Sequence, residues 1–160
     1  MNAKKLEELI VYLGSHPKVE NLGLTKLWKL IYFIDSESFR DGGELITDSE
    51  FIKYQHGPVP SRGEKILGKL VKSGAVTTTP VTIGTKILNE VKAARKPDES
   101  QFSPRELQIM DSTSSKYGGY TAIALSKISH KEPAWHYAEK MGKLSPGLMK
   151  YGWSEDPEGL

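Results

Sequence analysis

Four basic residues recur in one segment at a spacing that could bind phosphate groups or an acidic protein surface. They are Arg62, Lys65, Lys69 and Lys72. On a helix, intervals of three, four and three residues place all four side chains on one face. Such a face could contact a partner, and it could equally be a solvated helix surface, because lysine-rich faces are common in soluble proteins. The pattern therefore leaves both interpretations open.

The same segment contains a partial match to a phosphate-binding loop. Residues 63–69, GEKILGK, fit the pattern G-x-x-x-x-G-K. Nucleotide chemistry also needs a glycine-rich loop after a strand, and a Ser or Thr after the lysine to hold magnesium. Leu70 stands at that position, and the segment is predicted to be helical. We therefore predict no nucleotide site here.

The histidines do not have the spacing of a metal site. His130 and His136 are six residues apart with Pro133 between them, whereas two imidazoles on one helix face are four residues apart. The chain has no cysteine and no G-x-S-x-G motif. A hydrolase would require His56, His130 and a carboxylate such as Asp35 to converge in a cleft. We expect no enzyme activity, no catalytic residues, no metal and no cofactor.

A second candidate contact is the proline-rich stretch at residues 54–60, YQHGPVP. Its two prolines keep the residues before them out of helical angles, so the stretch is predicted to be a fixed, non-helical corner. We expect Tyr54, His56 and Pro58 to contact a partner together with the basic helix face.

The most apolar segment is Leu24–Ile34, LTKLWKLIYFI, which must position these residues. It is hydrophobic around most of its circumference, as expected of a helix in the middle of a small domain. Thr25 is predicted to be its N-cap and the glycine pair 42–43 to end it. The residues expected to be buried are Leu27, Ile31 and Ile34.

Capping signals delimit the other elements. A first helix is predicted over residues 3–13 with Gly14 as its cap, and a capping box of Ser61 and Glu64 opens a third helix that ends at Gly74. The β-branched stretch 75–88 predicts a hairpin. Further helices are expected over residues 103–116, opened by a second capping box, and over 120–129 and 130–141, where Pro133 breaks the last run or opens its helix.

These elements predict a mainly α (α+β) protein, a compact helical domain around a central hydrophobic helix with one small β-hairpin after the third helix. Residues 1–142 are expected to form one domain, followed by a Gly/Pro-rich C-terminal tail at 143–160. No apolar run approaches the roughly 20 residues that cross a bilayer. We expect a cytoplasmic protein without a membrane partner.

The net charge of +2 is unevenly distributed. Residues 35–50 contain six acidic residues and one basic residue, whereas residues 53–96 contain nine basic and two acidic residues. The domain should therefore present faces of opposite charge.

Three segments in sequence order carry a family resemblance: LTKLWKLIYFIDSESFRDGGELIT, YQHGPVP and ALSKISHKEPAW. Together they resemble the Panacea-domain family, which includes the SocA antitoxin and GepA-type phage-associated proteins. The resemblance spans residues 6–138. Its motif positions are Lys29, Leu30, Tyr32, Gly57, Pro58, Val59, His130, Pro133 and Trp135.

The resemblance implies a mostly helical antitoxin without enzymatic activity. Such a protein would neutralise a cognate toxin by direct contact or, in the manner of SocA, by delivering it to a protease such as ClpXP. The alternative is a winged-helix-like DNA-binding regulator of a phage or toxin-antitoxin operon, because a basic helix followed by a hairpin is also typical of that fold. DNA binding would fall steeply with salt.

Overall fold

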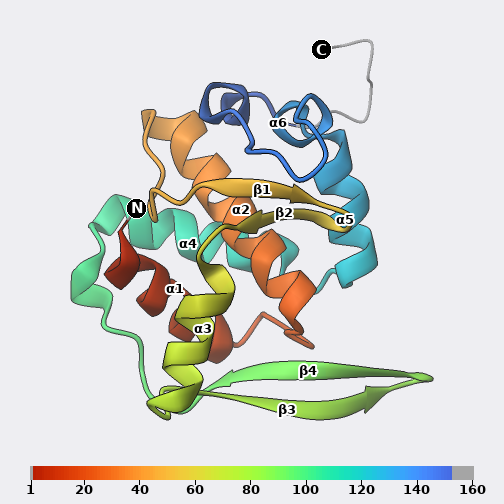
Figure 1. Cartoon of the computed structure of the whole chain (residues 1–160). Coiled ribbons are helices and arrows are strands. Elements are labelled where there is room, and N and C mark those ends of the chain that lie inside the picture. Colours follow the sequence, from red (N-terminus) through yellow and green to blue (C-terminus); the bar gives the residue numbers. More distant parts are fainter. Residues whose placement is uncertain (1, 153–160) are drawn as a thin grey trace.

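The computed structural model describes residues 2–152, which form six α-helices, two two-stranded antiparallel sheets and two 3-10 helices (Figure 1). The prediction of a mainly helical α+β protein is confirmed. No helix within residues 2–152 has the length and apolar composition needed to cross a membrane. In chain order the elements are α1 (Ala3–Ser15), α2 (Leu24–Gly42), β1 (Phe51–Tyr54), β2 (Gly57–Pro60), α3 (Gly63–Lys72), β3 (Val76–Ile83), β4 (Lys86–Ala93), η1 (Glu99–Gln101), α4 (Pro104–Tyr117), α5 (Ala122–Lys131), α6 (Pro133–His136) and η2 (Pro146–Lys150).

Helix α2 is buried along most of its length and packs against α1, α4, α5, β2, β4 and η2. Leu27, Ile31 and Ile34 are each 0% exposed, as predicted. The ring of Tyr32 lies edge-on to that of Phe51, with centroids 5.5 Å apart, and so joins α2 to β1. Each such side chain stabilises the fold by about 1.5–3 kcal/mol on burial.

The start of α2 differs from the prediction. Gly23 is the N-cap, and Thr25 lies within the first turn. The reason is that the backbone N–H of Val91 donates to the carbonyl of Leu22 at 2.7 Å, which fixes the chain against β4 just before the helix. The C-terminal end of α2 is as predicted. Gly43 adopts a φ of 76°, and its N–H donates to the carbonyl of Phe39.

The expectation of a single hairpin was wrong, because the proline-rich corner is itself a hairpin of β1 and β2. Pro58 pairs with Lys53, whose backbone N–H and C=O bond outward to Gly142 and Met141. In an antiparallel pair, two residues opposite each other both direct their backbone N–H and C=O groups either toward or away from the partner strand. At Pro58 and Pro60 these groups point away, so neither proline removes a hydrogen bond between β1 and β2. Two prolines at alternate positions are therefore compatible with an edge strand. The second hairpin, β3–β4, follows α3 as predicted and extends to Ala93.

Two further predicted caps were wrong and one more is confirmed. Arg62, not Ser61, is the N-cap of α3, and no side chain caps this helix. The backbone N–H of Ser61 donates to the carbonyl of Glu50, so Ser61 belongs to the end of the β1–β2 hairpin. Gly14 lies inside α1, where a Cβ would stand 2.9 Å from the nitrogen of Ala93, so the glycine allows close packing on β4. Ser103 and Glu106 form the expected capping box at α4.

The described part of the Gly/Pro-rich segment, residues 143–152, packs on the helical body. Its Leu144 and Met149 are buried, and Lys143 forms a bridge with Ile52 of β1. The remainder of the predicted tail, residues 153–160, lies outside the described residues.

A buried carboxylate ties α2 to the loop that follows it. Asp35 is 0% exposed and accepts hydrogen bonds from the backbone N–H of Thr47, at 3.0 Å, and from its hydroxyl group. Burial raises the pKa of Asp35 to about 6, although the hydrogen bonds from Thr47 act in the opposite direction. The folded protein therefore holds a proton that the unfolded chain releases near pH 4.

We predict that the free energy of unfolding falls by up to about 3 kcal/mol as pH rises from about 4 to about 6, since the folded state binds more protons in that window. In Asp35→Asn this pH dependence should be lost. Urea denaturation between pH 4 and 7 measures it. Asp41→Asn, an exposed carboxylate on the same helix, is the control and should keep the slope. An unchanged slope in Asp35→Asn would contradict this assignment.

Candidate functional site

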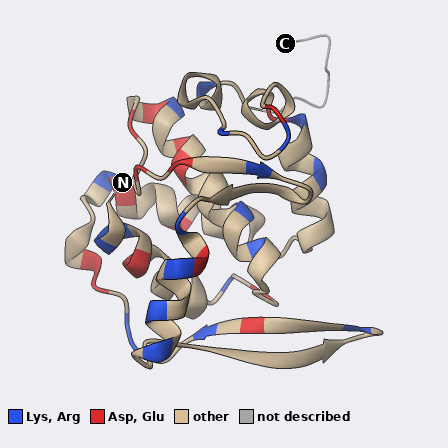
Figure 2. Cartoon of the chain, in the orientation of Figure 1, with Lys and Arg blue, Asp and Glu red and all other residues tan. Residues whose placement is uncertain are grey.

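The four predicted cations are all exposed, three on α3 and Arg62 at its N-cap. Figure 2 shows basic positions recurring along this helix. We call Arg62, Lys65, Lys69 and Lys72 the basic face. Lys69 donates to Glu7 of α1 at 2.8 Å, so its charge is partly compensated. The other three form no ion pair within residues 2–152. The basic face is thus a solvent-facing positive surface next to the β3–β4 hairpin.

The proline-rich hairpin does not extend this basic face. Its turn lies beside α5, at the opposite end of β2 from α3 (Figure 1). Tyr54 is 42% exposed and His56 is also exposed, whereas Pro58 is buried. Tyr54 and His56 are therefore accessible to a partner, whereas Pro58 is buried where β2 pairs with β1.

The hairpin turn instead brings several motif positions together against α5. Gly57 has a φ of 127°, and a Cβ there would lie 2.7 Å from Ser129 Oγ and 2.9 Å from Lys29 Nζ. Lys29 is only 1% exposed and bonds to no group in residues 2–152. Burial lowers the pKa of Lys29 to about 8.

A stacked histidine and tryptophan form the next part of this arrangement. The rings of His130 and Trp135 lie 3.9 Å apart at 14°, and Trp135 Nε1 donates to the carbonyl of Tyr54 at 3.4 Å. Lys53 Nζ lies 4.2 Å from the centre of the Trp135 ring. Burial lowers the pKa of His130, and the charge of Lys29 lowers it further. We call Lys29, Lys53, His56, Ser129, His130 and Trp135 the Lys29–His130 cluster.

The remaining motif positions have structural roles. Leu30 and Tyr32 are fully buried in the core, and Val59 packs against it. Pro133 opens α6 rather than breaking a longer helix, because a proline lacks the N–H that is unsatisfied anyway in the first turn.

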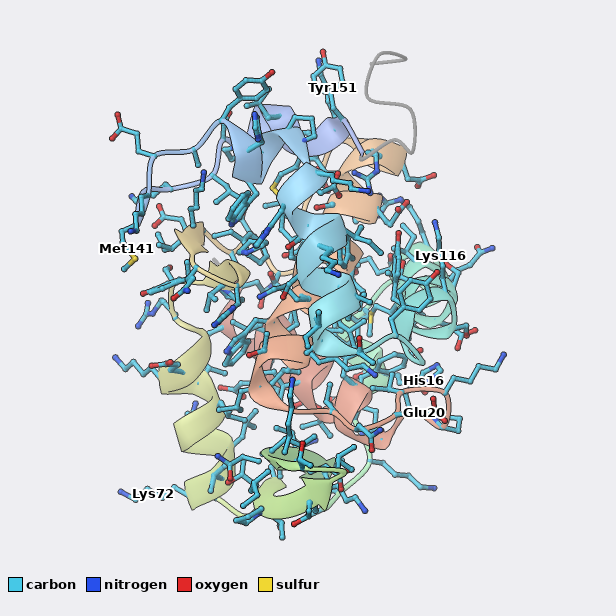
Figure 3. The ribbon with its side chains drawn as sticks, turned by 90° about the vertical axis from the view of Figure 1, so that its right-hand side faces the viewer. His16, Glu20, Lys72, Lys116, Met141 and Tyr151 are labelled. Carbon is cyan, nitrogen blue, oxygen red and sulfur yellow. The ribbon has the colours of Figure 1, made fainter. Side chains whose placement is uncertain are left out.

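A feature not predicted from the sequence is an apolar groove between the β3–β4 hairpin and the start of α5. Its volume is about 490 Å³. Ile87 is 74% and Ile123 is 54% exposed at its edges, and Ile83 and Tyr120 are also exposed there. Figure 3 shows this side of the molecule, with α5 running down the middle and the hairpin below it. The sequence does contain a signal for this groove, because Ile83 and Ile87 flank the turn of the β3–β4 hairpin. Isoleucine is also common in strands, so the hairpin alone accounted for both residues.

The carboxylate named in the hydrolase alternative is engaged by Thr47. Asp35 is buried, and both of its oxygens accept hydrogen bonds from Thr47. Within residues 2–152 no three acidic or histidine side chains are arranged to hold a metal ion.

The family model described as "Antitoxin SocA-like, Panacea domain" matches residues 27–136, more than half of the chain. The chain belongs to this family. The match runs from within α2 to α6, so the Panacea region includes the basic face and the Lys29–His130 cluster. It also includes the apolar groove, apart from the six lining residues that lie between positions 20 and 26. The resemblance inferred from the three sequence segments is confirmed. No curated protein and no solved structure matches the chain.

We predict that Gly57→Ala destabilises this Panacea domain by about 3 kcal/mol, because the added Cβ would overlap Lys29 at an unfavourable φ. The control Gly84→Ala also has a positive φ, but no atom lies within 4 Å of the added Cβ. It should cost only about 1 kcal/mol. Denaturant unfolding of both variants measures the difference, and equal losses would contradict the close packing at Gly57.

We predict that Lys29→Met raises the free energy of unfolding at pH 7 by about 2 kcal/mol, because it removes a buried charge without an acceptor. The depressed pKa means that the folded protein binds fewer protons than the unfolded chain between pH 8 and 10.5. Wild-type stability should therefore rise with pH across this window, and the variant should lose that rise. A variant less stable than wild type at pH 7 would contradict the prediction.

Proposed function

We propose that this Panacea-domain protein is the antitoxin of a toxin-antitoxin pair and neutralises its toxin by direct binding at the apolar groove. Family membership supports an antitoxin role. The observation that carries the proposed binding surface is the cluster of exposed Ile83, Ile87, Tyr120 and Ile123 around one concave surface.

Exposed apolar side chains gathered in one place are typical of protein contacts, whereas isolated ones are not informative. The groove joins a hairpin tip to the first turn of a helix, and the two elements are far apart in sequence. Burial of the two most exposed isoleucines would contribute several kcal/mol to a complex. The toxin surface that fits here is therefore apolar.

We further propose that neutralisation needs no catalysis by this chain. The only fully buried carboxylate of α2 is engaged by Thr47, and the isoleucines exposed at the groove edges, Ile87 and Ile123, are aliphatic. Occlusion of the toxin, or its transfer to a protease, could each start from the same bound complex.

The basic face is proposed as a secondary contact that accelerates association. Exposed charges change on-rates more than final affinities, and their effect falls with salt. This function does not require DNA, and the family description favours toxin neutralisation over the regulator alternative.

The test is co-expression with a neighbouring reading frame that is lethal when expressed alone. We expect the wild-type chain to restore growth and Ile87→Glu combined with Ile123→Glu to fail, with toxin affinity reduced about 100-fold because two buried apolar contacts are replaced by charges. Tyr137→Glu is the control, since Tyr137 is 74% exposed outside the groove.

Growth rescue by the double isoleucine variant would count against the groove. Charge reversal at Lys65 and Lys69 distinguishes the basic face from the apolar groove. We expect this variant to bind the toxin more slowly but still to restore growth. Loss of rescue from that reversal alone would favour the basic face as the main contact. Steeply salt-dependent DNA binding would instead support the regulator alternative.

A further inference from the structure

Lys29 is a buried ammonium group without an acceptor. Its side chain is 1% exposed and has no hydrogen bond or ion pair to any group in residues 2–152. The other buried lysine of α2, Lys26, donates instead to the carbonyls of Glu20 and Gly118. A buried charge that lacks a partner costs several kcal/mol, so a negative group that reaches Lys29 would be bound favourably.

The charged groups that influence His130 are all basic. His130 of α5 is influenced by Lys29 of α2, by Lys53 of β1 and by His56 of the hairpin turn. His130 Nε2 is itself buried without a hydrogen-bond partner in the described residues. The nearby carboxylate of Glu132 is directed to Arg40, at 3.8 Å. Lys29 Nζ and His130 Nε2 are thus both left without a hydrogen-bond partner in the described residues.

The backbone and a ring pack closely against the Lys29–His130 cluster. Gly57 places the turn backbone against Lys29, and the ring of Trp135 stacks on that of His130. His56 is exposed at the turn, and His130 is itself half-buried. The long aliphatic stem of Lys29 allows its ammonium group to move toward an entering anion.

The position of the cluster relates it to the apolar groove. Thr121 to Ile123, at the start of α5, line the groove, whereas Ser129 and His130 belong to its last turns. A ten-residue helix is about 15 Å long, so one partner lying along α5 can contact both sites. Figure 3 shows the two ends of α5 on the same side of the molecule, with the β1–β2 turn beside its upper half.

We propose that the Lys29–His130 cluster binds a carboxylate group on an acidic side chain of the toxin that occupies the apolar groove. One carboxylate oxygen accepts from Lys29 Nζ and the other from protonated His130 Nε2. This inference rests on the proposed function for its ligand source, while the site itself can be tested on the isolated chain.

The experiment is a titration of the full chain with sodium acetate, compared with sodium chloride at equal ionic strength, with NMR detection of the His130 imidazole. We expect saturable acetate binding that raises the pKa of His130, since the bound charge favours the protonated ring. Lys29→Met should weaken acetate binding at least tenfold, and His130→Gln should weaken it similarly, measured by calorimetry. Lys65→Met on α3 is the matched control and should bind acetate as wild type does.

A linear acetate response equal to that of Lys29→Met would overturn the site. Two amide-capped tripeptides, Ala-Glu-Ala and Ala-Gln-Ala, distinguish the source of the carboxylate. If Ala-Glu-Ala binds and Ala-Gln-Ala does not, the ligand is a protein side-chain carboxylate. If acetate binds but Ala-Glu-Ala does not, that assignment is overturned. Because no toxin is present, a negative result leaves the groove proposal standing, and failed growth rescue leaves the acetate result standing.

Discussion

The burial of the apolar part of α2, residues 27–34, is the constraint on which the rest of the structure depends. Nearly every face of this segment is covered, so any polar group on it must find a partner inside the protein. Lys26 meets this requirement with two backbone carbonyls, and Asp35 does so with Thr47. These contacts fix the loops that flank α2, and Lys29 is the member of the set whose charge stays uncompensated.

The same helix determines where partner-facing surfaces can form. Because α2 occupies the interior, α3, α5 and the two hairpins lie around it, and their outer faces carry the exposed charged and apolar side chains. The basic face is on α3, whereas the apolar groove and the Lys29–His130 cluster lie at the two ends of α5. An apolar contact can supply affinity, while charged groups supply orientation and rate. This division is the one expected if, as proposed, a toxin binds along α5.

Periodicity and capping chemistry predicted the helices well, because both act over a few residues. The burial of Leu27 and the capping box of Ser103 are examples. The errors arose where a distant segment decided the outcome. Ser61 has the right neighbours for an N-cap, but the hydrogen bond from its N–H to the carbonyl of Glu50 holds it at the end of the hairpin, and α3 begins one residue later, with Arg62 as its N-cap.

The candidate site was only partly predictable for the same reason. The basic face follows from spacing along one helix, whereas the apolar groove combines Ile87 with Ile123 from elements that are distant in sequence. The motif positions Lys29, Gly57 and His130 were identified from family resemblance, but their convergence required the fold. No local pattern signals that a lysine inside an apolar helix will be left without an acceptor.

We propose that the toxin lies along α5. Hydrogen-deuterium exchange of the chain, with and without its toxin, measures which residues become covered. We expect slower exchange in residues 83–88 and 120–131, with residues 62–72 little changed. Protection confined to residues 62–72, or absent from both ends of α5, would contradict it.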